Sequence, residues 1–334
     1  MKKLVISAVI GIFIACVVQI WIDRHIEADL CFFGQDVADV KDTWYKTVAG
    51  RSEKIHIIAG GSEIATSLDP DSIKDAYGIT VMNAGYHAGF GLPPILAVAS
   101  SYIRPGDHFV CSLYPSPQAL QMGMKFAFMR LGSGVLRSPV MPVSDADVLK
   151  IITGNLLLSC FHLDYAWSRY KYSLPQLHCY EIPENGKLHD SGFLELTVRT
   201  MEQKESPPTA YLTGPMEIYL QKTLHIRQYC DKVGADFSVL LPPLYNDSPA
   251  YRLRHAKIAL MLVEHGIRVL KDERLGICTD VTMFADTMAH LSSQGVQKNT
   301  EIWGKALKEG SFWTKEELQH VIEEYELSGR ADIL

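Results

Sequence analysis

The sequence has no excess of basic residues, no long like-charge block and no low-complexity tract. Its 334 residues carry 32 Lys and Arg against 38 Asp and Glu, a formal net charge of −6. A nucleic-acid-binding surface neutralises phosphates with clustered Lys and Arg, so this charge balance argues against a nucleic-acid partner. The composition, with 47% hydrophobic and 21% charged residues, is that of a globular protein with a substantial core.

The cysteines lack any metal-binding or disulfide-framework spacing. Seven are present, and none forms a CxxC motif or a Cys/His cluster of the kind that binds zinc. We therefore predict no structural metal. An oxidising compartment permits disulfides among the six that follow Cys16, but their wide, irregular spacing favours buried thiols that pack as small hydrophobes.

Long apolar runs are absent except at the N-terminus. Lys2 and Lys3 precede residues 4–22, which contain no charged side chain. As a helix this run spans roughly 28 Å, close to the ~30 Å hydrocarbon core of a bilayer. It is long for a cleaved signal peptide and has no convincing cleavage site, so we predict one transmembrane anchor, with a cleaved signal as the alternative. The two lysines place the bulk of the chain on the periplasmic or extracytoplasmic side.

Beyond residue 50, short apolar runs alternate with helical patterns. This alternation indicates βαβ units and a parallel sheet, and hence an α/β fold. Strands are predicted at 54–59, 79–83, 108–113 and 236–241, with further candidates at 267–270 and 281–284. Helices are predicted at 92–102, 217–230, 251–264 and 291–307, and a capping box at 314–317 begins one more.

These patterns divide the chain into four parts. Residues 1–23 form the predicted anchor, 24–50 a membrane-proximal segment, 51–310 the α/β domain, and 311–334 a C-terminal helix. Within the domain, residues 115–210 interrupt the alternation with helical stretches and many aromatic residues. We interpret them as a helical insertion over the carboxyl ends of the strands.

Three short motifs follow predicted strands. Ser62 follows Gly60 and Gly61 after the first strand, Gly85 ends the second, and Asp286 and His290 follow the last candidate. Taken singly, each has a structural interpretation, as a helix cap, a turn glycine or a loop polar residue. Because parallel strands bring their carboxyl ends to one edge of a sheet, we expect all three motifs to meet there.

Together the motifs favour acyl-transfer chemistry. His290 would deprotonate Ser62, and Asp286 would orient the imidazole and stabilise its cation. The backbone N–H groups of Ser62 and Gly85 are candidate oxyanion donors. Asn83 and His87 lie in the same motif as Gly85 and are speculative substrate contacts.

This set of motifs resembles the SGNH/GDSL hydrolase superfamily. It is more narrowly similar to membrane-anchored, DltD-like members that act in acylation of surface polysaccharides or teichoic acids. The resemblance covers roughly residues 54–310, with Gly295 and Thr300 also matching, and the insertion matches poorly. It implies a three-layer, flavodoxin-like sandwich and serine acyl-ester chemistry without a metal or other cofactor. By carry-over, Ser62 is the nucleophile, His290 the base, Asp286 its partner and Gly85 an oxyanion donor.

One family block is missing. The Gly-x-Asn-Asp run that supplies an oxyanion asparagine has no match after the third strand, where residues 112–116 read Ser-Leu-Tyr-Pro-Ser. Two functions therefore stay open. The first is a serine esterase or O-acyltransferase on a surface polysaccharide, with an acylated glycan and a membrane-bound acyl-donating protein as partners. The second is a non-catalytic scaffold or glycan-binding subunit of a surface-polymer modification complex.

Overall fold

The computed structural model describes residues 11, 13, 14, 17, 32–50, 53–86, 92–112, 186–196, 216–246 and 248–327. Within these ranges, no helix is both long and apolar enough to cross a membrane. The predicted anchor at residues 4–22 lies outside the described residues except for Gly11, Phe13, Ile14 and Val17, all of which are exposed.

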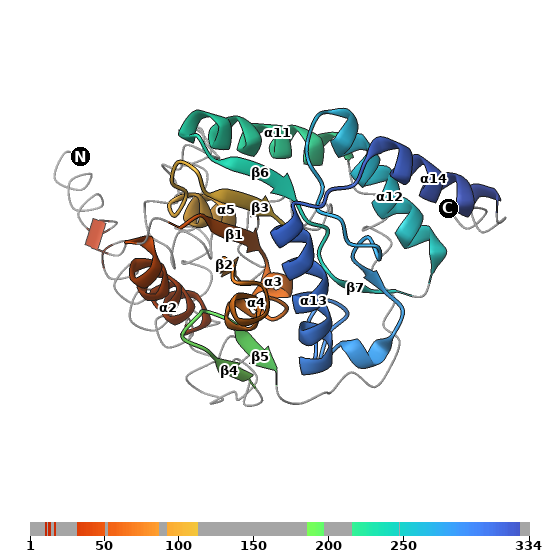
Figure 1. Cartoon of the computed structure of the whole chain (residues 1–334). Helices are drawn as coiled ribbons and strands as arrows, with labels where there is room; N and C mark the ends of the chain where they lie inside the picture. The colour runs from red at the N-terminus through yellow and green to blue at the C-terminus, as the bar shows by residue number, and fades with distance from the viewer. Residues whose placement is uncertain are drawn as a thin grey trace.

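A parallel four-stranded sheet forms the centre of the molecule (Figure 1). Its strands follow the order β2-β1-β3-β6, and every neighbouring pair is parallel. Their bounds are β1 Ile55–Gly60, β2 Thr80–Gly85, β3 His108–Cys111 and β6 Asp236–Val239. A bridge from Val239 to Val269 extends the sheet by one parallel step beyond β6. The prediction of an α/β fold with a parallel sheet is confirmed.

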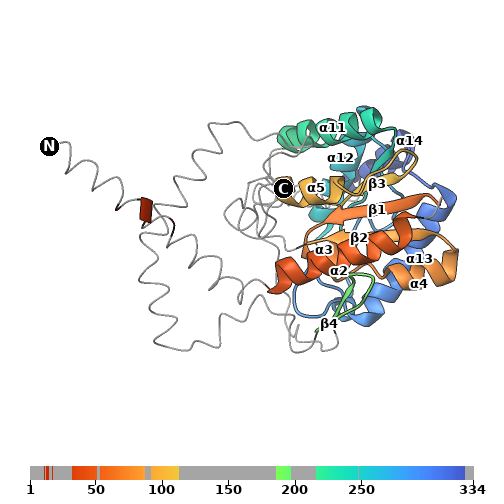
Figure 2. The same cartoon turned by 90° about the vertical axis from the view of Figure 1, so that its left-hand side faces the viewer.

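Helices cover both faces of the sheet, because alternate strand residues are apolar on either side (Figure 2). Ile57 and Phe109 face one large apolar cluster, while Ile58 and Val110 face the other. The first face is covered by α5 Leu92–Ser100, α11 Met216–Val233 and α12 Pro249–Glu264. The second is covered by α3 Ser62–Ala65, α4 Pro70–Tyr77 and α13 Ser293–Glu309, while α14 Lys315–Leu327 packs on α12.

Two predicted strands near the end of the domain differ from the structure. Residues 267–270 contribute only isolated bridges at Val269 and Leu270. The candidate strand at 281–284 is wrong, because Val281–Met283 forms the 3-10 helix η4. Its apolar residues resemble a strand, but Asp280 accepts the backbone N–H of Thr282 and caps a turn instead.

Several elements were not predicted, including the short helices α3 and α4. Helix α2, Phe32–Ala49, lies in the membrane-proximal segment. A small antiparallel hairpin, β4 Gly186–Leu188 with β5 Leu194–Leu196, lies in the predicted helical insertion, most of which is outside the described residues. A short parallel pair, β7 Leu244–Tyr245 with β8 Ile277–Cys278, lies beside the main sheet.

Candidate active site

Ser62 is the first residue of α3, immediately after β1 and its N-cap residue Gly61. The turn between them is tight, because a Cβ at Gly60 would overlap the side chain of Ile64 and the carbonyl oxygen of Ser112. Glycine at position 60 therefore lets α3 fold back close to the end of the strand. The arrangement leaves the Ser62 side chain partly buried at the carboxyl edge of the sheet.

Asp286 and His290 lie in a loop whose two ends are held together. Phe284 and Leu291 form an antiparallel bridge, and both are buried in one apolar cluster. Within the loop, the N–H of His290 donates to Thr287 Oγ1 at 3.2 Å. These contacts hold the Asp286 and His290 side chains above the buried apolar cluster. The preceding element is η4 and not the strand expected from the sequence.

The three predicted side chains meet in one hydrogen-bonded chain. Ser62 Oγ lies 2.9 Å from His290 Nε2, and His290 Nδ1 lies 2.9 Å from Asp286 Oδ1. A carboxylate only accepts, so Nδ1 donates its proton to Asp286 and Nε2 is left to accept from the hydroxyl of Ser62. The geometry is that of a nucleophile, a general base and a carboxylate that orients the base.

The charge state of Asp286 suits this arrangement. Burial acts to raise the pKa of Asp286, but the hydrogen bond and positive charge of His290 outweigh it, so this pKa lies below its usual value. Asp286 is therefore ionised at neutral pH. Its side chain is 35% exposed and that of His290 is 20% exposed, so solvent and substrate can reach the pair.

The Asn83 side chain is hydrogen-bonded within the protein. Its side chain is fully buried. Nδ2 donates to the carbonyl oxygens of Ile64 at 3.1 Å and Leu68 at 2.8 Å, which lie in and just after α3. These contacts give no support to the prediction that Asn83 contacts substrate, because its side-chain amide is bonded to α3, to Lys41 and to the N–H of Gly85. His87, the other speculative contact, lies outside the described residues.

Gly85 packs closely against α3, and its N–H is engaged within the turn. Its N–H donates to Asn83 Oδ1 at 3.0 Å, so it is not directed at a bound oxyanion in this arrangement. A Cβ at this position would overlap the backbone of Ala65 in α3. The prediction that Gly85 is an oxyanion donor is not supported, because this turn is closed by the Asn83 side chain.

Two candidate groups for the oxyanion site can be placed. The Ser62 N–H belongs to the first turn of α3, where backbone donors have no partner within the helix. Ser112 stands directly after β3, and its buried Oγ has no hydrogen-bond partner among the described residues. Residues 113–116 lie outside the described part of the chain.

Sequence reasoning missed two buried ionisable residues at this edge. Glu63 is 3% exposed and its Oε1 accepts the N–H of Gly61 at 2.8 Å. Burial raises the pKa of Glu63. Lys41, on α2, is 1% exposed and donates to the carbonyl oxygen of Asn83 at 2.6 Å. The signal for Lys41 is its place on the apolar stripe of α2, between Val37 and Val48.

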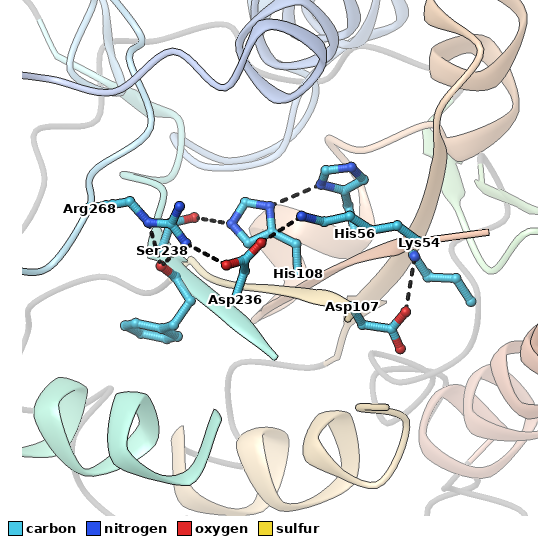
Figure 3. Close-up of polar contacts among 9 residues, drawn as sticks. Lys54, His56, Asp107, His108, Asp236, Ser238 and Arg268 are labelled. Carbon is cyan, nitrogen blue, oxygen red and sulfur yellow. Dashed lines mark hydrogen bonds and ion pairs between the residues drawn. The ribbon is translucent and has the colours of Figure 1, made fainter. Parts of the chain in front are cut away.

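A second polar cluster lies at the opposite edge of the sheet (Figure 3). His56 and His108 share a hydrogen bond of 3.0 Å between their Nδ1 atoms, and His108 Nε2 lies 2.8 Å from Ser238 Oγ. Burial lowers the pKa of His56 to about 4 and that of His108 to about 3. Both rings are neutral at neutral pH, and at the amino ends of the strands they are remote from Ser62.

Among the described residues, no group of three or more His, Cys, Asp or Glu side chains has an arrangement that could hold a metal ion. Cys111 and Cys230 are buried free thiols, and Cys278 is a half-buried one. Comparison with known family models, with curated proteins and with solved structures found no match to this chain.

Proposed function

We propose that the protein is a serine esterase or O-acyltransferase that acts on a surface polysaccharide through an acyl-enzyme intermediate. The observation that supports this most is the continuous chain of hydrogen bonds from Ser62 through His290 to Asp286, with both heavy-atom distances at 2.9 Å. Ser62 lies 228 residues before His290 in the chain, so local structure alone does not bring the two side chains together. The parallel sheet, with helices on both faces and strand order β2-β1-β3-β6, is compatible with the flavodoxin-like, three-layer sandwich of SGNH proteins.

The reaction follows from the positions of the protons. Ser62 Oγ attacks the ester carbonyl carbon while its proton passes to His290 Nε2, and Asp286 stabilises the imidazolium. The tetrahedral intermediate then expels the alcohol, which takes the proton back from His290, and the acyl group remains as an ester on Ser62. Attack by water completes an esterase reaction, and attack by a sugar hydroxyl completes a transferase reaction.

Oxyanion stabilisation is expected from the Ser62 N–H at the start of α3. A single missing oxyanion donor typically costs ~2.7–4 kcal/mol in the barrier. With the Gly85 N–H bound to Asn83, a second donor would have to come from another group, and Ser112 Oγ is the described candidate. The proposed enzyme is therefore slow unless substrate or a partner completes the site.

The polymer substrate and the location belong to the same proposal. A polysaccharide assembled at the membrane fits a chain whose N-terminal run of residues 4–22 predicts a single-pass anchor with the domain outside the cytoplasm. An acylated glycan and a membrane-bound acyl-donating protein are the partners that this proposal implies. No nucleic-acid partner is expected, given the net charge of −6.

The alternative is a scaffold or glycan-binding subunit that has lost efficient chemistry. The engaged N–H of Gly85 and the missing third block favour it. The intact Ser62–His290–Asp286 arrangement favours the enzyme, because a scaffold has no need to keep all three side chains in hydrogen-bonding order.

A fluorophosphonate probe separates the two functions, because it reacts only with an activated serine. We expect the purified full-length chain to be labelled and the Ser62→Ala variant not to be. Asp286→Asn should fold and yet lose labelling rate by roughly 10³–10⁴-fold, since the amide favours the wrong imidazole tautomer. A folded wild-type chain that is not labelled, together with full complementation of a deletion strain by Ser62→Ala, would establish the scaffold function.

A further inference from the structure

Lys41 is a buried lysine whose hydrogen bonds reach none of the three triad side chains. Its side chain lies on α2 and is 1% exposed. The Nζ donates to Asn83 O at 2.6 Å, to Gly192 O at 2.8 Å and to Asn83 Oδ1 at 3.2 Å, and it lies 5.6 Å from the centre of the Tyr86 ring. An ammonium group has three donors. Lys41 therefore uses every donor, and its hydrogen-bond acceptors are all neutral.

Burial in this way is costly, so stability alone is a poor reason for a lysine here. Desolvation lowers the pKa of Lys41 to about 7. Burying a charge without a countercharge costs free energy, which makes methionine the simpler residue for an apolar stripe. Val37 and Val48 occupy that same stripe of α2 with ordinary apolar packing.

The first acceptor, Asn83, connects Lys41 to the helix that carries Ser62. Asn83 receives Lys41 on both its carbonyl oxygen and Oδ1, and its Nδ2 donates to the backbone of Ile64 and Leu68. Ile64 lies two residues after Ser62 in α3. The orientation of the Asn83 amide thus connects Lys41 to the short helix that presents the serine hydroxyl.

The second acceptor, Gly192 O, connects Lys41 to the segment beside the loop of the general base His290. Gly192 lies in the turn of the β4–β5 hairpin, and a Cβ there would collide with the Lys41 side chain. The next residue, Phe193, packs in one cluster with Phe284 and Leu291. Those two residues close the loop that carries Asp286 and His290. Lys41 is thus bonded on one side to the support of Ser62 and on the other to the hairpin beside His290.

We propose that Lys41 is a positioning residue, which ties α3 to the β4–β5 hairpin and so holds Ser62 and His290 at hydrogen-bonding distance. The proposal rests on the proposed function, because the distance between those two side chains matters only if the serine is activated. Near-attack geometry is demanding, and a misplacement of about 1 Å costs on the order of 100-fold in rate. A purely structural Lys41 would instead affect folding and leave the reactivity of folded molecules unchanged.

The test compares three variants of the full-length chain. Lys41→Met keeps the length of the side chain and removes its donors, while Lys41→Gln restores a neutral donor. Lys46→Met is the matched control, because Lys46 lies on the same helix with a side chain that is 73% exposed. For each folded variant, fluorophosphonate labelling of Ser62 gives the maximal rate and the half-saturating probe concentration, and hydrogen–deuterium exchange follows residues 62–68, 189–193 and 284–291.

We expect Lys41→Met to lower the maximal labelling rate roughly 10- to 100-fold with little change in the half-saturating concentration. Lys41→Gln should recover part of that rate, and Lys46→Met should match the wild type. Exchange should rise in all three segments of Lys41→Met. A folded Lys41→Met protein with the wild-type labelling rate overturns the proposal.

Failure of the proposed function gives a different result. In that case the wild-type chain itself is not labelled, whatever residue stands at position 41. The hydrogen–deuterium exchange measurement then tests only whether Lys41 connects α3 to the β4–β5 hairpin. A joint rise at residues 62–68 and 189–193 supports it, and a rise in only one segment or in neither overturns it.

Discussion

The lack of a side chain at Gly85 sets how closely α3 approaches the end of β2. It pairs with Gly60 across β1 and β2, and its Cα hydrogens face the backbone of Ala65 in α3. Its N–H is closed off by Asn83 Oδ1. The glycine therefore lets the helix that carries Ser62 lie directly against the end of β2.

Substitution of Gly85 should lower the stability of the fold. Because a Cβ at position 85 would overlap the backbone of Ala65, Gly85→Ala should lower the free energy of unfolding by about 3 kcal/mol, as overpacked cores do. Urea unfolding followed by circular dichroism measures this change. Gly50→Ala is the control, since a Cβ at Gly50 meets no atom within 4 Å. Equal stabilities of the two variants would show that α3 moves away without cost.

Helix α14 shows an element whose start is encoded locally. Thr314 and Glu317 exchange hydrogen bonds as a capping box, with Thr314 N donating to Glu317 Oε2 at 3.0 Å and Glu317 N donating to Thr314 Oγ1 at 3.2 Å. Leu318 follows at once and is fully buried in the apolar cluster of the first face, on the side where α14 packs on α12. The cap thus determines where the helix begins, and Leu318 determines which side it buries.

Removing the cap should cost a small, measurable amount of stability. Thr314→Ala leaves the N–H of Glu317 without its side-chain acceptor, and such a loss typically costs about 1 kcal/mol. Chemical denaturation checks the change in the free energy of unfolding. Thr47→Ala is the matched control, because Thr47 Oγ1 bonds back to Trp44 O within the exposed part of α2 and caps nothing. A Thr314→Ala protein as stable as this control would contradict the capping role.

At the scale of the whole molecule, buried neutral histidines link stability to pH. His56, His108 and His255 have pKa values lowered by burial, to about 4, 3 and 4. In the unfolded chain a histidine titrates near pH 6.5. The unfolded state therefore binds more protons as the pH falls below 6.5, so the stability that these groups contribute is complete above that pH and is lost towards pH 4.

This linkage predicts acid destabilisation that one substitution reduces. The Nδ1–H of His255 donates to Leu275 O at 2.7 Å, and an asparagine amide can supply a similar donor without titrating. His255→Asn should lose less stability between pH 7 and pH 5 than the wild type, by an amount on the order of 2 kcal/mol. Urea unfolding at several pH values measures this. His320→Asn is the control, because that side chain is 72% exposed, and a His255→Asn pH profile identical to the control would refute the prediction.

The predicted anchor can be tested on the same scale. Each buried core residue that the structure describes lies at Val37 or later. Deleting residues 1–23 should therefore leave a folded domain in the soluble fraction, while the full-length chain sediments with membranes. Cell fractionation and circular dichroism measure the two properties. A truncated chain that is insoluble or has lost its tertiary packing would place the domain boundary elsewhere.

Elements with local signals could be predicted from the amino-acid sequence. The apolar runs of β1, β2, β3 and β6 are six residues or fewer and end at turns, and the capping box of α14 is readable from Thr314 and Glu317. The position of Ser62 at the carboxyl edge of the sheet was also predictable, because the carboxyl ends of parallel strands meet there. Asp286 and His290 reach the same edge after the 3-10 helix η4 and not after the predicted strand, so the meeting of strand ends does not account for their position. The α/β fold class was predictable from the alternation of strand and helix patterns.

The hydrogen-bond partners of the polar groups near that edge became known from the folded arrangement. Asn83 and Gly85 read as a substrate contact and an oxyanion donor, but their hydrogen bonds go to α3 and to each other. Lys41 reads as a surface lysine until α2 is packed against the hairpin of Gly192. Such roles depend on acceptors that are 42 and 151 residues away in the chain. Local sequence patterns carry no information about those partners, because they record periodicity and turn chemistry but not which buried groups meet.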